Sequence, residues 1–105
     1  MTAVPSPPAL LQLRLYLVSG APNSIAARTN LAAILAGLPR ADYELDIVDC
    51  ISEPHRALAE GVLVTPTLVK SAPAPTQVIV GSLSDRTRVL AALGLERLGD
   101  ANGAA

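Results

Sequence analysis

Aromatic side chains are almost absent from this sequence of 105 residues, which has two tyrosines, no phenylalanine and no tryptophan. Half of the residues are nevertheless hydrophobic, so a core has to be built from leucine, valine, isoleucine and alanine. This composition is typical of a globular chain and not of a disordered one. At this length we expect a single domain with a single core.

An excess of charge of either sign is also missing, because eight Lys and Arg residues stand against nine Asp and Glu residues. No cluster of basic residues is present, which argues against a nucleic acid or an anionic membrane as the partner. The apolar segment 10–18 is interrupted by Arg14, follows no positively charged residue and is too short to span a bilayer. We therefore expect a cytoplasmic protein.

Cysteine and histidine occur once each, as Cys50 and His55. A single cysteine forms no internal disulfide, which fits a reducing compartment, and no metal-site spacing is present. The sequence also has no Gly-rich phosphate loop and no Ser/His/acid set. We therefore expect no catalytic residue, no metal and no cofactor. The neighbouring Asp49 should raise the pKa of the Cys50 thiol, which favours a small core residue, while a thiol-dependent enzyme that uses Cys50 is an alternative.

The two ends of the sequence differ from its middle. Three prolines fall within residues 1–9, and residues 99–105 are small and show no apolar period. We expect a disordered N-terminal lead at 1–9, a folded domain over 10–98 and a flexible tail at 99–105.

The first half of the domain has clear periodicity. Leucines alternate with other residues over 11–17, which predicts a strand with the leucines on one face. A strand over 43–48 should lie parallel to it, since strand, helix and strand at this spacing form a βαβ unit. The helix between them is predicted to begin with Asn23 or Ser24 as its cap, and its apolar residues are Ala27, Leu31, Ile34, Leu35 and Leu38.

The second half is less clearly patterned. We expect a short helix capped by Ser52, strands over 67–70 and 77–80, and a closing helix that starts from Ser84. The resulting order, βαβ-α-ββα, is the thioredoxin plan of an α/β fold. The β-branched run at 62–64 follows the short helix directly, so local propensity does not settle this half.

The junction between the first strand and the first helix lacks the residues that thioredoxin chemistry requires. A thioredoxin has Cys-x-x-Cys there, because the helix N-terminus stabilises the attacking thiolate. This sequence has Gly20-Ala21-Pro22-Asn23 instead. Dithiol exchange at this position is therefore excluded, and we expect Asn23 to cap the helix.

Acidic residues gather on the second strand, at Asp42, Glu44, Asp46 and Asp49. Strand alternation puts Glu44 and Asp46 on the same side. We interpret this side as a solvated face and not as a catalytic carboxylate cluster.

Three segments of the sequence, residues 15–24, 64–70 and 80–86, resemble in their order and spacing those of the KaiB family of circadian-clock proteins. Residues 15–24 (LYLVSGAPNS) are similar to that family's junction of first strand and first helix. Residues 64–70 (VTPTLVK) resemble its central Thr-Pro-Thr-Leu segment, and residues 80–86 (VGSLSDR) resemble its Gly-x-Leu-Ser-Asp-Arg junction.

The resemblance implies a non-enzymatic regulator that binds the N-terminal ATPase ring of a KaiC-like protein, with KaiA or a sensor kinase as further possible partners. It also implies fold switching, in which the second half takes either the thioredoxin-like arrangement or a ground-state arrangement that forms homodimers or homotetramers. The candidate positions for this switch, with a cis bond before Pro66, are Pro66, Pro73, Pro75, Gly81 and Asp85.

The partner surface is expected on the short helix, together with the edge of the second strand. Its candidate residues are Glu53, His55, Arg56 and Glu60. The sequence departs from the family at Ala26, a position that is commonly basic, whereas Arg28 lies two residues on. An alternative function is therefore a KaiB-like stress-response or signalling protein that binds a KaiC-like ATPase outside an oscillator.

Overall fold

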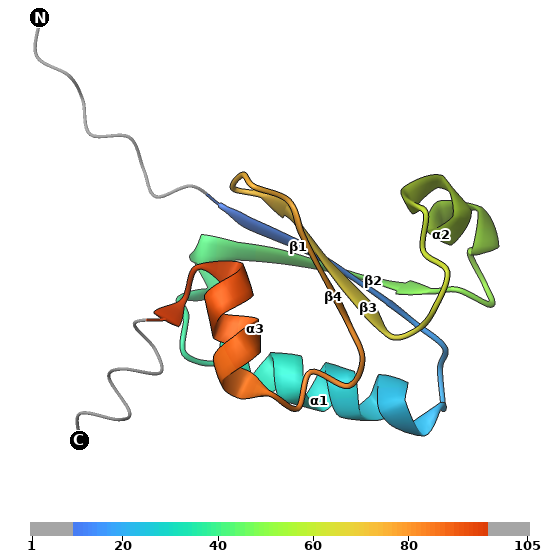
Figure 1. Ribbon diagram of the computed structural model, residues 1–105, viewed down its shortest axis with the longest axis horizontal. Coiled ribbons are helices and arrows are strands. Elements are labelled where there is room, and N and C mark those ends of the chain that lie inside the picture. The colour runs from blue at the N-terminus through green and yellow to red at the C-terminus, as the bar shows by residue number, and fades with distance from the viewer. Residues whose placement is uncertain (1–9, 97–105) are drawn as a thin grey trace, which may run out of the picture.

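A computed structural model describes residues 10–96 and places them around one four-stranded sheet (Figure 1). The expected lead at 1–9, the tail at 99–105 and the end of the domain at residue 98 lie outside the described residues. The elements, in chain order, are β1 (Leu11–Leu17), α1 (Pro22–Leu35), the 3₁₀ turn η1 (Arg40–Asp42), β2 (Tyr43–Asp49), α2 (Pro54–Glu60), β3 (Thr67–Ala72), β4 (Gln77–Val80) and α3 (Arg86–Leu93). The predicted order βαβ-α-ββα is confirmed.

The strands lie in the order β2-β1-β3-β4, so the first strand of the chain is inside the sheet. β1 and β2 are parallel, with Leu11 opposite Tyr43 and Leu17 opposite Asp49, as the βαβ pattern predicted. β3 runs antiparallel to β1 and to β4, which leaves β2 and β4 as the two outer strands.

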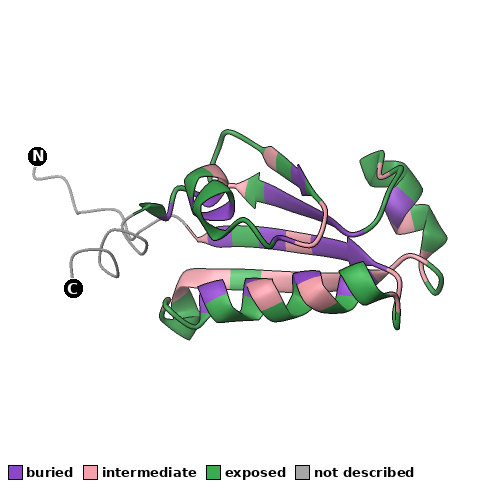
Figure 2. Ribbon diagram, turned by 60° about the horizontal axis from the view of Figure 1, so that its bottom comes forward, coloured by how far each residue is buried: buried purple, intermediate pink, exposed green. Residues whose placement is uncertain are grey.

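The main core lies on one face of the sheet, beneath α1 and α3 (Figures 1 and 2). The alternating leucines of β1 all point into it, because a period of two matches the pleat of a strand. Four of the predicted apolar residues of α1 are buried, and Leu38 is partly buried at the edge of the cluster. The helix residues in this core are Ala27, Leu31, Ile34 and Leu35 of α1 and Val89, Leu90 and Leu93 of α3.

A second, smaller cluster lies on the opposite face, which we call the α2 face. It consists of Tyr16, Val48, Ala57 and Val69, with Cys50 and Val62 packed against it. β1 is therefore buried on both faces at Tyr16, whereas Gln12 on the α2 face is exposed and Arg14 is partly exposed. The strand residues of the α2 face are Gln12, Arg14 and Tyr16 of β1, Glu44, Asp46 and Val48 of β2, Thr67, Val69 and Ser71 of β3, and Val78 and Val80 of β4.

The helix starts differ from the sequence predictions. α1 begins at Pro22 with Ala21 as its N-cap residue and without a side-chain cap, so the predicted caps Asn23 and Ser24 were wrong. Proline suits the first helical position because its fixed φ is already helical and it needs no N–H there. The buried Ser24 hydroxyl accepts a hydrogen bond from the Val18 N–H instead, at 3.1 Å.

The two later helices begin and end at residues with clear roles. Glu53, and not Ser52, stands at the N-cap position of α2, again without a side-chain cap. Asp85 caps α3 by accepting a hydrogen bond from the Arg88 N–H at 3.1 Å. Gly61 ends α2 in the left-handed conformation, which costs glycine little.

The second half takes the thioredoxin-like arrangement in this structure. The peptide bonds that precede Pro66, Pro73 and Pro75 are cis. Gly81 has a positive φ and Asp85 is the α3 cap, as described above. The second, ground-state arrangement of this half stays a prediction.

Candidate functional site

α2 stands by itself at one end of the sheet, on the α2 face (Figure 1). Its seven residues bury one side chain, Ala57, which packs against Tyr16, Val48 and Val69. The apolar contact of this helix is therefore small, and polar contacts must contribute to its position.

An ion-pair network links α2 to the strands below it. Its centre is the Asp46 carboxylate on β2, which receives the Arg56 guanidinium from α2 and Nε of Arg14 from β1, the latter at 3.2 Å. Arg56 also pairs with Glu53 at 3.2 Å, and Arg14 pairs with Glu60 at 3.3 Å. The α2 ion-pair network is the set Arg14, Asp46, Glu53, Arg56 and Glu60.

These charged side chains are between a third and a half exposed, so each pair alone contributes little to stability. The pairs matter more for the position of α2, because Asp46 and Arg14 each contact two partners and so link the pairs into one network. The hydrogen bonds that Arg56 donates to the carboxylates of Asp46 and then of Glu53 raise the pKa of its guanidinium. The network therefore orients one side of α2 toward β1 and β2.

The structure brings together three of the four predicted partner-surface residues, namely Glu53, Arg56 and Glu60. The fourth, His55, is exposed on the same helix, and its side chain makes no hydrogen bond to any of residues 10–96. Sequence reasoning missed Arg14 and Asp46. The sequence did contain a signal for this pair. Arg14 interrupts the leucines of β1, and Asp46 lies opposite it on the parallel strand β2.

The interpretation of the β2 carboxylates as one solvated face fits Glu44 but does not include the ion pairs of Asp46. Glu44 is exposed. Asp46 is partly buried and is shared by two arginines. Alternation places both carboxylates on the same face, but only Asp46 lies under α2, which alternation alone does not reveal.

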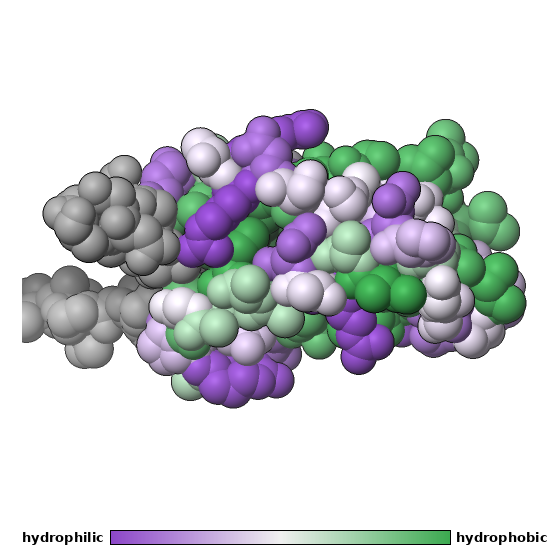
Figure 3. Space-filling model, turned by 90° about the horizontal axis from the view of Figure 1, so that it is seen from below, coloured by the Kyte–Doolittle hydropathy of each residue, from purple (hydrophilic) through white to green (hydrophobic). Residues whose placement is uncertain are grey.

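The exposed apolar residues near α2 were also missed. Leu58 on the helix and Ile51 in the turn before it are each 73% exposed. By contrast, the surface on the side of α1 intermixes hydrophilic and hydrophobic residues (Figure 3). Two large exposed aliphatic side chains beside a charged network make a surface with apolar anchors and polar surroundings, as in protein interfaces.

The junction of β1 and α1 carries Gly20-Ala21-Pro22-Asn23 and no thiol. Cys50 lies after β2, where it is partly buried against the α2-face cluster, and its backbone N–H donates to the Leu17 carbonyl at 2.8 Å. Burial, and then the Asp49 carboxylate, raise the pKa of the Cys50 thiol. The predicted direction of this shift is therefore confirmed.

The Asp49 carboxylate has defined partners of its own. It accepts hydrogen bonds from the Ile51 N–H and the Ser19 hydroxyl, each at 2.9 Å, and these bonds lower its pKa. Asp49 therefore stays ionised beside the thiol and disfavours the thiolate.

We expect the Cys50 thiol to react slowly with iodoacetamide at neutral pH, because the thiolate is the nucleophile and the raised pKa makes it scarce. The measurement is the alkylation rate by mass spectrometry across a pH series, with the chain unfolded in urea as the reference. The rate should rise at higher pH in the folded protein than in the unfolded chain. Faster alkylation of the folded protein at neutral pH would instead support a thiol enzyme.

Residues 10–96 contain no group of three or more His, Cys, Asp or Glu side chains that could hold a metal ion. No helix among them is long and apolar enough to cross a membrane.

The sequence of this chain is similar to those of known proteins. The sequence profile of the KaiB domain matches residues 14–95. The chain is 43% identical over 88 residues to the circadian clock oscillator protein KaiB of Prochlorococcus marinus strain MIT 9313, covering 84% of this chain and 72% of that protein. It is 41% identical over 90 residues to the KaiB of Acaryochloris marina, covering 84% of this chain and 86% of that protein.

Solved structures show the same fold. The N-terminal domain of Synechococcus elongatus SasA superposes with a TM-score of 0.67 at 25% identity, covering 89% of this chain and 91% of that one. Mitochondrial thioredoxin 3 of Saccharomyces cerevisiae gives a TM-score of 0.67 at 15% identity, covering 80% and 76%. The fold is therefore thioredoxin-like. With the domain match and the curated relatives, it follows that this chain belongs to the KaiB family of circadian-clock proteins.

Proposed function

We propose that this chain is a non-enzymatic KaiB-type regulator that binds a KaiC-like ATPase. The observation that carries the proposal is the combination of family membership with a charged and apolar surface on α2. We define this α2 surface as Glu53, His55, Arg56, Glu60, Leu58, Ile51 and the outer edge of β2.

The α2 surface combines two kinds of contact. Leu58 and Ile51 are exposed aliphatic side chains that a partner can cover, which gains free energy by removing apolar area from water. Glu53, Arg56 and Glu60, at or near the same helix, add charges whose positions are fixed by ion pairs, of Arg56 with Asp46 and Glu53 and of Glu60 with Arg14. Charges fixed before binding lose less side-chain entropy when a partner contacts them.

Two features of the chain support a non-enzymatic role. The β1–α1 junction has no thiol, and the pKa of the Cys50 thiol is raised and not lowered. Both features disfavour a nucleophilic cysteine, which needs a lowered pKa. They support a role in binding.

We expect Leu58→Glu to weaken capture of the cognate KaiC-like ATPase by at least about tenfold, because it replaces an exposed aliphatic side chain of this surface by a charge. His55→Ala should weaken binding less, since this side chain makes no hydrogen bond to the described residues. Binding is measured by biolayer interferometry on the immobilised ATPase.

Two matched variants sharpen this experiment. Arg28→Ala changes an exposed arginine on α1, on the other side of the sheet, and should leave binding unchanged. Asp46→Asn weakens the network but leaves the outer α2 side chains intact, so it separates positioning of α2 from direct contact. If Leu58→Glu and His55→Ala bind as tightly as the parent chain, the surface is wrongly placed.

A further inference from the structure

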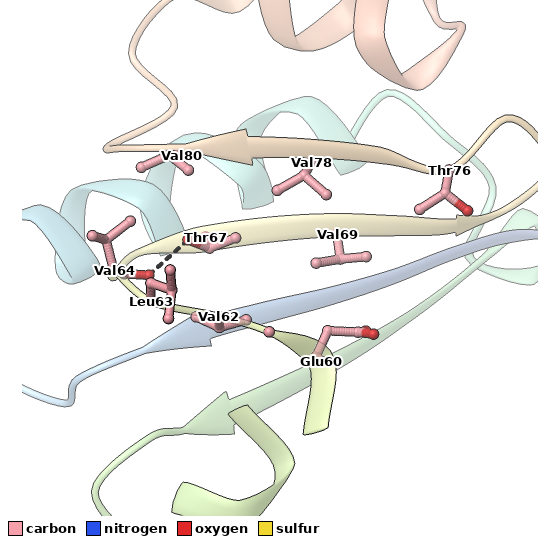
Figure 4. Close-up of a pocket in the computed structure, with 10 residues that line it drawn as sticks. Glu60, Val62, Leu63, Val64, Thr67, Val69, Thr76, Val78 and Val80 are labelled. Atoms are coloured by element: carbon pink, nitrogen blue, oxygen red, sulfur yellow. Dashed lines mark hydrogen bonds between the residues drawn. The ribbon is translucent and has the colours of Figure 1, made fainter. Parts of the chain in front are cut away.

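An apolar groove lies on the α2 face, between the end of α2 and β4 (Figure 4). Its volume is about 330 Å³. Val69 of β3 lies along its floor, and Val78 and Val80 of β4 form one side. β4 is an outer strand whose open edge pairs with no other described strand. The segment from Glu60 to Val64 forms the opposite side of the groove.

Aliphatic side chains on both sides of this groove are uncovered. Val78 and Val80 are 58% and 52% exposed, and Leu63 and Val64 across from them are 91% and 53% exposed. The Thr67 hydroxyl donates to the Val64 carbonyl at 2.7 Å, as the dashed line in Figure 4 shows, and so holds the loop between α2 and β3 in position. Apolar walls that are in place before binding are typical of a ligand site.

Of the described residues that line the groove, only Glu60 is charged. Its two carboxylate oxygens differ. Oε1 receives the Arg14 guanidinium at 3.3 Å and the Tyr16 hydroxyl at 3.4 Å, whereas Oε2 receives no hydrogen bond from any residue that the structure describes. No charged residue occurs from 71 to 84, the stretch that includes β4. The groove therefore combines an aliphatic surface with one free anionic oxygen.

A lysine side chain matches both properties of the groove. Its methylene stem covers apolar surface while its ammonium group stays with a polar partner. An arginine fits less well, because its guanidinium favours both oxygens of a carboxylate at once, and Oε1 of Glu60 is already occupied. Charge and shape together therefore select a compact cation on an aliphatic stem.

We propose that the groove binds a lysine-bearing aliphatic segment of another protein. The lysine stem lies along Val69 and Val78, and its ammonium group pairs with Oε2 of Glu60. A second copy of this chain does not supply this group, because Lys70 is the only lysine in the sequence and is buried, at 5% exposure. The inference goes beyond the proposed function, since of the α2 surface it uses only Glu60.

Peptide titration followed by NMR tests the groove. The acetylated and amidated peptide Thr-Val-Lys-Val-Thr is added, into the millimolar range, to the isotope-labelled chain at constant concentration. We expect saturable shifts of the amide signals of Gly61, Val69, Val78 and Val80, and none in α1. The absence of saturable shifts, or shifts confined to the α2 ion-pair network, overturns the proposal. Shifts of the same signals with protein concentration alone would place a second copy in the groove and would also overturn it.

A thermodynamic cycle tests the contact between the lysine and Glu60. In the control peptide norleucine replaces lysine, which keeps an aliphatic stem and removes the charge. The parent chain should bind the lysine peptide at least about threefold more tightly than the norleucine peptide. Glu60→Gln should abolish this preference. If the parent chain shows no preference, or if Glu60→Gln weakens both peptides equally, the proposed contact is wrong.

Two lysine variants of the chain locate the site. Val78→Lys puts a cation of the chain's own into the groove and should weaken binding of the lysine peptide by at least about tenfold. Ile25→Lys adds the same charge on α1, where Ile25 is similarly exposed at 55%, and should leave binding unchanged. Circular dichroism should show an unchanged fold for both. Equal effects of the two variants contradict the proposal.

The same titration keeps this proposal separate from the proposed function. Leu58→Glu, the variant that tests capture of the ATPase, changes a residue outside the groove lining and should leave binding of the lysine peptide unchanged. A chain that captures the ATPase but does not bind the peptide overturns the groove proposal alone. A chain that binds the peptide in the groove but does not capture the ATPase supports it and contradicts the proposed function.

Discussion

Replacing Leu15 by alanine is expected to lower the free energy of unfolding by about 2–5 kcal/mol. Leu15 is fully buried in the inner strand β1, between Ile47 of β2 and Leu68 of β3. It points into the main core beneath α1 and α3, so truncation removes apolar burial and leaves a cavity. Domains of this size have a total stability of about 5–15 kcal/mol, so the loss is a large fraction.

The measurement is urea unfolding followed by far-UV circular dichroism. Leu63→Ala is the matched control, since this leucine is almost fully exposed and should change the stability by less than about 0.5 kcal/mol. An equal effect of the two substitutions would show that β1 does not lie inside the sheet as described.

Tyr16→Ala is expected to cost about 3 kcal/mol or more and to release α2 from the sheet. Tyr16 is the largest side chain of the small cluster on the α2 face, and its hydroxyl donates to Glu60 at 3.4 Å. Without the ring, Ala57 loses its main apolar neighbour on β1. The exposed ion pairs alone hold α2 weakly.

Hydrogen exchange distinguishes this effect from global unfolding. In Tyr16→Ala the amides of α2 should lose protection to a greater extent than those of α1. Tyr16→Phe keeps the ring and removes one long hydrogen bond, so it should cost about 1 kcal/mol or less and leave α2 protected. Equal loss of protection in both helices would contradict the separate role of the α2-face cluster.

The main core could be predicted from the sequence because its signal is periodic. The leucines of β1 repeat every two residues, and Ala27, Leu31 and Ile34 repeat at helical spacing, so each element shows its buried side directly. The parallel pairing of β1 and β2 then follows from the short connection between them.

The α2 face could not be predicted in the same way. Asp46 and Glu44 are equivalent in the strand pattern, yet only Asp46 lies under α2, whose position depends on tertiary contacts. The predicted caps of α1 were wrong for a local reason. An asparagine and a serine near the start of α1 match the usual cap residues, but the helix begins at Pro22, so its N-cap residue is Ala21, two residues before Asn23 and three before Ser24.

The open β4 edge was missed for a further reason. The sequence predicts a strand at 77–80, but it does not say whether that strand is inside the sheet or at its edge. The uncharged stretch from 71 to 84 was visible in the sequence. Only the strand order shows that this uncharged stretch lies along an outer strand of the sheet.

The inner position of β1 has a consequence for synthesis on the ribosome. Arg14 pairs with Val69, so about 55 residues separate the two partners along the chain. At roughly 5–20 residues per second, β1 leaves the ribosome several seconds before β3. During that interval β1, with its four leucines, exposes the edge that β3 covers from Gln12 to Tyr16 in the finished protein. The first strand, and not the last, is therefore the segment that most needs protection by a chaperone while the chain is being made.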